Sequence, residues 1–455
     1  HGLPLPTAAD LSGNSALEAT ALKALDLAAP RRIVAVLHCY DSVFLASSKG
    51  EADAMLAMLT EWCWETKAEF HIGTDKTVAM VMSGTLMGST EASLRPLCLP
   101  QKCRRSAGSG QPLVFKNSHR WLGLRWPADL VFRTALTERV AIARSVFSEL
   151  PFLVASKEIP LTIALELFES KVDGVLAFGR WCFTLADCAQ EVLDDVYQEW
   201  ALALLGGDRW RNAAVAMSEL GWKLSGYSRA LVDVALRRAR VWTMASGLLY
   251  RDAFQLAHNS GAPLSWAARS ANLLKAAGLV DWPQAPSNVR TPEDYSELVK
   301  STLELLDSAR AATRIREHRA TVPHYVFQVG PSPHLRAAKA LELPWQIQLC
   351  MRAWCRFRAG LVVLAGKNGR RSAAKFQSCL FCQSVVRNAV VHCLSTCPRW
   401  DGQRLSFKEV VRPSPDVTKD LFARLVLGCV PGDAAFCLVA AWFDEIDSES
   451  QSALS

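Results

Sequence analysis

The fold of the N-terminal part is decided by the stretch Ile33–Val34–Ala35–Val36–Leu37–His38–Cys39–Tyr40–Asp41–Ser42–Val43–Phe44–Leu45–Ala46. One apolar run enters a short polar segment and a second apolar run leaves it, a pattern that predicts a β-hairpin. Asp41 lies at the predicted tip. A solvated turn acid is the simpler interpretation of this residue, and a metal-binding carboxylate is the functional one.

The residues after this hairpin predict a helix over 50–67. Ser48 and Glu51 have the spacing of a capping box, in which each side chain bonds a backbone N–H of the first turn. The helical spacing of the apolar residues predicts a buried face made of Met55, Leu56, Leu59 and Trp62. Further strands are expected near 77–82 and 120–124, and residues 130–350 read as mostly helical, so the predicted class is α+β. One of these helices, from about residue 230, is expected to carry Arg237, Arg238 and Arg240 on a polar face.

Aligned from Leu45–Ala46–Ser47–Ser48, the hairpin resembles the Tyr-Ala-Asp-Asp hairpin of reverse transcriptases in the form used by LINE-type (non-LTR) retrotransposons. Tyr40 stands where the family has its first Asp, and Asp41 keeps the second. The stretch 69–82 resembles the next palm motif, and its Lys76 matches a lysine that the family places near the incoming nucleotide. Residues 120–124 are similar to the strand that grips the primer end. The resemblance implies a partial palm of a small antiparallel sheet plus helices, followed by a mainly helical thumb and C-terminal region.

The resemblance also bears on activity. Template-directed nucleotide addition uses two metal ions held by carboxylates. The family takes one Asp from an upstream strand, expected before residue 1 of this chain, and two from the hairpin. Tyr40 is a phenol that is neutral at pH 7 and a poor ligand for Mg²⁺. We therefore expect Asp41 and Lys76 to be catalytic remnants, the chain as given to be inactive as an RNA-directed DNA polymerase, and Mg²⁺ to bind only if that activity survives.

A basic segment covers residues 309–378. It contains thirteen Lys and Arg but two acidic residues, a net charge of +11 within a chain whose total is +7. Such a segment attracts phosphate backbones, although a solvated helix face is the alternative. Trp345, Trp354 and Phe357 lie among these charges and could stack on bases. The expected partner is RNA, DNA or both, and the candidate binding residues are Arg352, Arg356, Arg358, Lys367, Arg370, Arg371 and Lys375.

Directly after the basic segment come Cys379, Cys382, His392 and Cys397. The spacing Cys-x2-Cys-x9-His-x4-Cys suits four ligands around a tetrahedral Zn²⁺, and a set of buried free cysteines is the alternative. Cys393 is a possible competing ligand, but its neighbour His392 would crowd the geometry. The end of the motif, Cys397–Pro398–Arg399–Trp400, resembles the Cys-Cys-His-Cys knuckle of LINE-type reverse transcriptases.

Composition limits the class of protein and its location. Half of the 455 residues are hydrophobic, enough for a sizeable core. The start carries no signal-peptide pattern, charged residues interrupt the most apolar segments, and the fourteen cysteines are scattered. We therefore expect an intracellular protein, in cytoplasm or nucleus, with no membrane partner. The expected domains are 1–128 (partial palm), 129–308 (helical thumb and connection), 309–378 (basic segment), 379–400 (knuckle) and 401–455 (C-terminal helices and a frayed tail).

Three functional hypotheses remain open from the sequence. The first is a degenerate, truncated LINE-type reverse transcriptase that keeps zinc and nucleic-acid binding. The second is the C-terminal part of a working reverse transcriptase whose missing catalytic residues come from elsewhere. The third is a helical zinc-binding interaction protein with no nucleic-acid role. Salt-dependent RNA or DNA binding would separate the third hypothesis from the other two.

Overall fold

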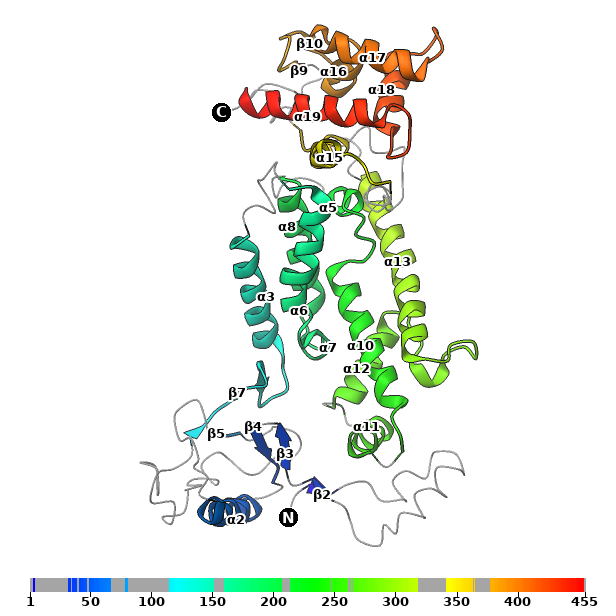
Figure 1. Cartoon of the computed structure of the whole chain (residues 1–455). Coiled ribbons are helices and arrows are strands. Elements are labelled where there is room, and N and C mark those ends of the chain that lie inside the picture. Colours follow the sequence, from blue (N-terminus) through cyan, green and yellow to red (C-terminus); the bar gives the residue numbers. More distant parts are fainter. Residues whose placement is uncertain are drawn as a thin grey trace. The chain divides into compact units, whose positions relative to one another are not determined.

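The computed structural model describes residues 3–4, 32–33, 35–38, 41–46, 49–66, 78–80, 114–150, 159–206, 213–246, 248–260, 263, 265–317, 341–362, 364 and 377–453. Most of these residues are helical and the strands form small two-stranded pairs, so the predicted α+β class is confirmed (Figure 1). The chain divides into two compact units: unit 1 comprises 1–139, 179–189 and 230–299, and unit 2 comprises 140–178, 190–229 and 300–455. Each unit is built from separated stretches of sequence, whereas the domains expected from the sequence are contiguous.

In the described part of unit 1, the strands form four separate pairs. Their bounds are β1 (Leu3–Pro4), β2 (Arg32–Ile33), β3 (Ala35–His38), β4 (Asp41–Phe44), β5 (Val78–Ala79), β6 (Val114–Phe115), β7 (Ser118–Trp121) and β8 (Leu124–Pro127). The pairs β1–β2, β3–β4 and β7–β8 are antiparallel, and β5–β6 is parallel. The small antiparallel sheet expected for the palm therefore appears, among the described residues, as independent pairs of mixed direction.

The β3–β4 pair is the hairpin that the sequence predicts. Its register places His38 opposite Asp41 and Ala35 opposite Phe44. The two residues between the strands, Cys39 and Tyr40, lie outside the described residues. Asp41 is thus the first residue of β4, at the turn end of the hairpin.

The β7–β8 pair lies where the sequence predicts a single strand over 120–124, and that prediction is wrong: the stretch contains the end of β7, a two-residue turn and the start of β8. Leu122 and Gly123 form its turn with φ of 49° and 76°. Positive φ at both central positions is the geometry whose twist matches that of paired strands. The indole rings of Trp121 and Trp126 lie 6.3 Å apart and pack across this hairpin.

Helix α2 (Lys49–Thr66) confirms the helix expected over 50–67. Met55 and Thr60 are its buried residues, and Leu56 and Leu59 are half-buried. Trp62 was predicted to be buried, but its side chain is 53% exposed. Ser48 of the predicted capping box lies outside the described residues.

Unit 1 also contains helices, and one of them carries a buried arginine. They are α7 (Arg180–Phe183), α11 (Leu249–Asn259), α12 (Trp266–Ala276) and η3 (Trp282–Gln284), with parts of α3 (Arg133–Ser148), α10 (Gly226–Trp242) and α13 (Pro292–Glu317). Arg238 was expected on a polar face but is fully buried. Its guanidinium donates to Asp281 Oδ1 at 2.9 Å and to Ser270 Oγ at 2.6 Å. The buried charge is stable there because a carboxylate and a hydroxyl accept its hydrogen bonds.

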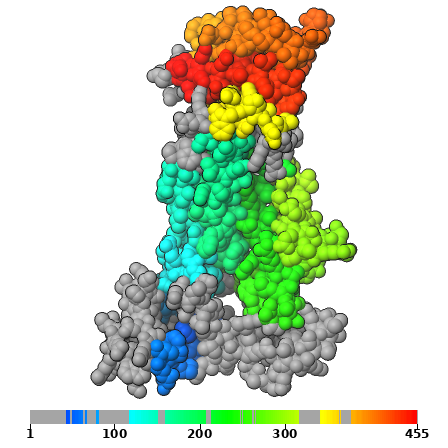
Figure 2. Space-filling view, viewed as in Figure 1, coloured from blue at the N-terminus to red at the C-terminus, as the bar shows by residue number. Residues whose placement is uncertain are grey.

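Unit 2 contains an aromatic core. Its remaining elements are α5 (Leu161–Leu167), η2 (Phe168–Asp173), α6 (Gly174–Ala177), α8 (Ala189–Leu204), α9 (Ala213–Glu219), α15 (Trp345–Arg358), β9 (Gln377–Ser378), β10 (Val385–Val386), α16 (Ala389–Ser395), η6 (Pro398–Trp400), α17 (Asp401–Val411), α18 (Lys419–Gly428) and α19 (Phe436–Ser452). The ring of Phe168 lies 5.3 Å from that of Trp200 and 5.1 Å from that of Trp222. A second aromatic contact joins α15 to α19, where Phe357 stacks on Phe443 at 4.1 Å. Figure 2 shows the red surface of α19 lying against the yellow surface of α15.

Candidate metal centre

The four predicted zinc ligands lie on two adjoining pieces of local structure in unit 2. Cys379 and Cys382 occupy the connection between the antiparallel strands β9 and β10. Within this connection the Cys379 N–H donates to the Ser384 carbonyl at 2.8 Å, and the Gln383 N–H donates to the Cys379 carbonyl at 3.0 Å. Gln383 adopts a positive φ of 60°, which lets the chain reverse within a few residues. This tight reversal brings the thiols of Cys379 and Cys382 onto the same side of the turn.

The other two ligands come from α16 and its C-terminal end. The Asn388 side chain caps this helix by accepting from the N–H groups of Val390 and Val391, both at 3.1 Å. His392 lies in the helix, and its carbonyl accepts from the Cys397 N–H at 2.7 Å. This bond folds the chain back after the helix, so Cys397 returns to the level of His392.

The ligand atoms of Cys379, Cys382, His392 and Cys397 converge. They all lie within 4.8 Å of one another. The Sγ atoms of Cys379 and Cys397 are 4.0 Å apart, and Cys382 Sγ is 3.1 Å from His392 Nε2. Sulfurs at two corners of a tetrahedral zinc site with 2.3 Å bonds lie about 3.8 Å apart. The four side chains, called the Cys/His cluster below, can therefore hold one metal ion with little movement.

Neighbouring groups fix the orientation of the cluster. The His392 Nδ1 lies 3.0 Å from Thr396 Oγ1, so Nε2 is the nitrogen that faces the cysteines. Metal-binding histidines commonly hold their second nitrogen in such a hydrogen bond. The buried guanidinium of Arg404 donates to the Cys397 carbonyl at 2.6 Å and supports that ligand's backbone. Sequence reasoning missed both Thr396 and Arg404, although Thr396 lies four positions after His392, where a helix brings side chains together.

Burial and hydrogen bonds give the three thiols of the cluster different pKa values. Burial raises the pKa of Cys397 to about 12 and also raises the pKa of Cys379. At Cys382 burial also raises the pKa, but hydrogen bonds with Ser384, His392 and Cys379 outweigh it and lower the pKa to about 6. Three thiolates at this separation repel one another strongly unless a divalent cation compensates their charge. The cluster is thus arranged for a metal ion that displaces protons when it binds.

Cys393, the alternative ligand suggested by the sequence, is not part of the Cys/His cluster. Cys393 is fully buried beside His392, and it is not one of the residues whose ligand atoms converge. Its burial raises the pKa of the thiol well above 9. The expectation that adjacency to His392 would exclude it agrees with this placement.

The predicted nucleic-acid-binding arginines differ in their burial and in their hydrogen-bond and ion-pair partners. Arg358 is 7% exposed, and its guanidinium donates to Glu219 at 3.0 Å and to the Leu427 carbonyl at 2.5 Å. Arg356 forms an ion pair with Asp447 at 3.2 Å. Arg352 is half-buried, and burial lowers its pKa. The other four candidates, Lys367, Arg370, Arg371 and Lys375, lie outside the described residues.

The aromatic residues of the same segment also differ in exposure. Trp354 and Phe357 are buried, whereas Trp345 is 49% exposed. Of these three predicted stacking residues, Trp345 is the one with a face accessible to a base.

The structure describes the predicted catalytic remnants in part. Asp41 is placed at the start of β4 by its backbone register with His38. Tyr40 and Lys76 lie outside the described residues. The structure therefore brings the proposed metal ligands together, and it gives no arrangement of a polymerase site.

No family model, curated protein or solved structure matches this chain. Across the described part of the chain, every helix is either too short or too polar to cross a bilayer.

Proposed function

We propose that this chain is a degenerate reverse transcriptase of the LINE type that binds zinc and nucleic acid and has lost polymerase activity. The convergence of the Cys/His cluster is the observation that carries the proposal. It agrees with the knuckle motif that the sequence resembles, and it is held by hydrogen bonds of the β9–β10 connection and of α16.

Zinc is the metal that best suits the cluster. Three thiols and one imidazole are soft to borderline ligands, and four such ligands in tetrahedral arrangement are typical of structural zinc sites. Two of the ligands, Cys379 and Cys397, are fully buried, and all four positions come from protein side chains. A closed ligand set of this kind favours a structural role for the ion over a catalytic one.

Nucleic-acid binding is proposed for the basic segment next to this cluster. The support is its net charge, together with the exposed Trp345 and the half-buried Arg352 on α15. Lys367, Arg370, Arg371 and Lys375 lie between α15 and the Cys/His cluster in the sequence and are kept as candidates. Arg358 is not, because a guanidinium buried against Glu219 cannot reach a phosphate without leaving an unpaired buried carboxylate.

Loss of polymerase activity follows from Tyr40. A reverse-transcriptase hairpin binds Mg²⁺ through two carboxylates, and a neutral phenol replaces one of them in this sequence. Metal stabilisation supplies several kcal/mol of the barrier reduction in such reactions, so the loss of a ligand has a large effect on rate.

The proposal is tested by zinc content and salt-dependent binding of the same preparations. The purified chain should contain one equivalent of zinc and bind single-stranded RNA with an affinity that falls as salt rises. Cys379→Ser should lose zinc and bind RNA more weakly. Cys437→Ser is the matched control, because Cys437 is exposed and lies outside the cluster.

A second pair of variants tests the basic segment. Replacing Arg370 and Arg371 with Ala should flatten the dependence of log affinity on log salt by about 1.4, since each lost phosphate contact on a single strand changes the slope by about 0.7. Absence of zinc from the wild-type chain would refute the zinc assignment. Salt-independent or undetectable RNA binding would leave the helical interaction protein as the better hypothesis.

A further inference from the structure

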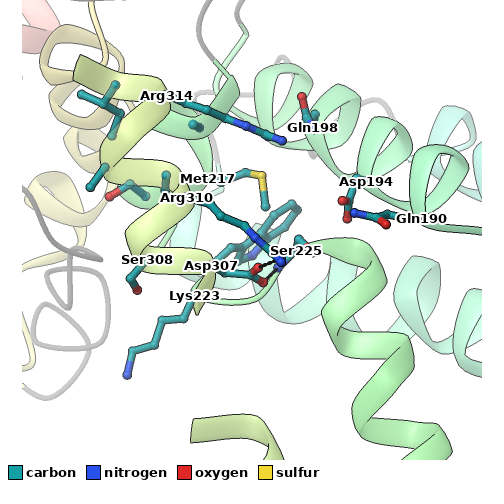
Figure 3. Close-up of a pocket in the computed structure, with 16 residues that line it drawn as sticks. Gln190, Asp194, Gln198, Met217, Lys223, Ser225, Asp307, Ser308, Arg310 and Arg314 are labelled. Carbon is teal, nitrogen blue, oxygen red and sulfur yellow. Dashed lines mark hydrogen bonds and ion pairs between the residues drawn. The ribbon is translucent and has the colours of Figure 1, made fainter. Parts of the chain in front are cut away.

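Unit 2 contains a second candidate site, a cavity of about 220 Å³ between α8, α9 and α13 (Figure 3). Helix α8 lines it with Gln190, Asp194 and Gln198, which are four positions apart and so share one face. Helix α13 lines the opposite side with Arg310 and Arg314. The cavity is thus bounded by amide and carboxylate groups on one helix and guanidinium groups on another.

Asp194 retains capacity to accept further hydrogen bonds. Its Oδ1 accepts from the Tyr227 N–H at 2.9 Å, and the Ser225 side chain is a second hydrogen-bond partner. Burial raises the pKa of Asp194, and these two hydrogen bonds partly oppose that rise. An ionised carboxylate can accept about four hydrogen bonds. The two that remain are suited to N–H donors of a ligand.

Arg314 differs from the other cations around the cavity. Arg310 pairs with Asp307 at 3.2 Å, and Lys223 pairs with Glu304 at 3.2 Å. Within the part of the chain that the structure describes, the guanidinium of Arg314 has no such hydrogen bond or ion pair. Its charge lowers the pKa of Asp194 through space, and Figure 3 shows the side chain extending from α13 toward Gln198.

Asp194 and Arg314 therefore present opposite charges to one cavity without forming an ion pair. A ligand that joins them needs N–H donors at one end and an anionic group at the other. The cavity has a volume of about 220 Å³, below the roughly 300–1,000 Å³ of ordinary small-molecule pockets, so it can enclose a ring but not a whole drug-sized ligand. Arg314 is exposed, so the anionic end of such a ligand can lie outside the enclosed volume. Met217 and Trp222 add apolar surface to the lining, which suits a flat ring.

We propose that this cavity binds a guanine mononucleotide, with the base donating to Asp194 and the phosphate bound by Arg314. Guanine carries two adjacent N–H donors on its Watson–Crick edge, which match a carboxylate that can only accept. Adenine offers an acceptor in place of one of these donors and is a poorer match. The planar guanidinium of Arg314 suits phosphate oxygens. The charges of Arg310 and Lys223 are already compensated by carboxylates, so Arg314 is the cation assigned to the phosphate. The site contains none of the residues of the Cys/His cluster or the β3–β4 hairpin, so this inference does not depend on zinc binding or on the loss of polymerase activity. Arg310 and Arg314 do belong to the basic segment, but a mononucleotide that binds with a preference for guanine is distinct from salt-dependent binding of RNA.

Calorimetric titration of the full chain with GMP, AMP and inorganic phosphate tests the site. GMP should bind more tightly than AMP. Asp194→Asn should weaken GMP binding about tenfold, because it removes one charged hydrogen-bonding group, and it should not weaken phosphate binding, because it removes a negative charge near Arg314. Arg314→Gln should weaken GMP and phosphate alike. Arg412→Gln is the matched control, since Arg412 is an exposed arginine outside the cavity lining.

A second variant of the cavity lining controls for an effect of Asp194→Asn on folding. Asp194 accepts from a backbone N–H near the start of α10, so Asp194→Asn also tests that helix start. Gln198→Met keeps the side-chain length without the amide, and it should weaken GMP binding without changing the thermal unfolding of the chain. No detectable GMP binding to the wild-type chain, or equal affinities for GMP and AMP, would overturn the proposal.

Discussion

The Cys/His cluster and the β3–β4 hairpin are both built around a short antiparallel strand pair, but their functional groups have different origins. All four ligands of the cluster lie within residues 379–397, and the hydrogen bonds that orient them come from that stretch and from Arg404, seven residues after Cys397. In the reverse-transcriptase site that we propose for its ancestry, such a hairpin contributes at most two of the carboxylates, and the rest come from distant strands. A site whose ligands and scaffold are local can persist by itself, whereas a composite site loses its chemistry when one contributor changes.

The largest expected effect concerns the hairpin. With an RNA template, a DNA primer and Mg²⁺, the chain should extend no primer above background, and Tyr40→Asp should not restore extension. The reason is that Tyr40→Asp supplies two carboxylates where the family uses three to hold its metal ions. Gel analysis of primer length measures this result. Extension by the unmodified chain would show that a working site is assembled from other residues.

The next effect concerns the independence of the cluster. Chelation of the proposed zinc should increase amide hydrogen exchange in β9, β10 and α16 by orders of magnitude, because structural zinc contributes about 10–16 kcal/mol in zinc-finger peptides. Exchange in β3–β4 should not change. Mass spectrometry of the chain with and without EDTA measures both segments in one experiment. Unchanged exchange at α16 would mean that packing alone, without a metal ion, holds the four side chains together.

A smaller effect is expected from the group that orients His392. Thr396→Val removes the hydroxyl 3.0 Å from His392 Nδ1 and should weaken zinc binding about tenfold, the usual consequence of losing such a partner. Thr396→Ser keeps the hydroxyl and should bind zinc like the wild type. Competition with a chromophoric chelator gives both affinities. Wild-type zinc affinity in Thr396→Val would show that the hydrogen bond to His392 does not matter.

The smallest effect concerns the helix that carries His392. Asn388→Ala removes the acceptor for the Val390 and Val391 N–H groups and should destabilise α16 by about 1 kcal/mol. Asn388→Asp keeps an acceptor and should cost less. Zinc affinity and thermal unfolding of the holo-protein measure the change. A loss as large as that from Cys379→Ser would mean that the helix start, and not the ligands, limits assembly of the site.

Local patterns in the sequence predicted the elements that depend on few residues. The spacing of Cys379, Cys382, His392 and Cys397 predicted their convergence because the turn and the helix between them have fixed geometry. Helix α2 was predicted to within one residue at each end, since capping and apolar spacing are local signals.

Burial of charged and aromatic side chains could not be predicted in this way. Arg238 was expected on a polar helix face, and Arg358 was expected to bind phosphate. Each is instead buried in an ion pair with a carboxylate more than forty positions away in the sequence. Trp62 was expected to be buried and is exposed. Such outcomes depend on which distant element packs against a face, and net charge or helical spacing carries no information about that. The cavity between α8 and α13 was missed for the same reason.

The burial of Arg358 has a consequence for genetic screens of the basic segment. Its guanidinium joins α15 to Glu219 of α9 and to the Leu427 carbonyl of α18, so its removal leaves an uncompensated carboxylate in the interior. A library of alanine variants selected for loss of RNA binding would recover Arg358→Ala alongside true contact residues, although the variant acts by lowering the amount of folded protein. Measuring protein abundance for every variant in the same screen would separate the two groups. Arg358, which its position in the basic segment marks as a contact residue, would then be identified as a residue needed for folding.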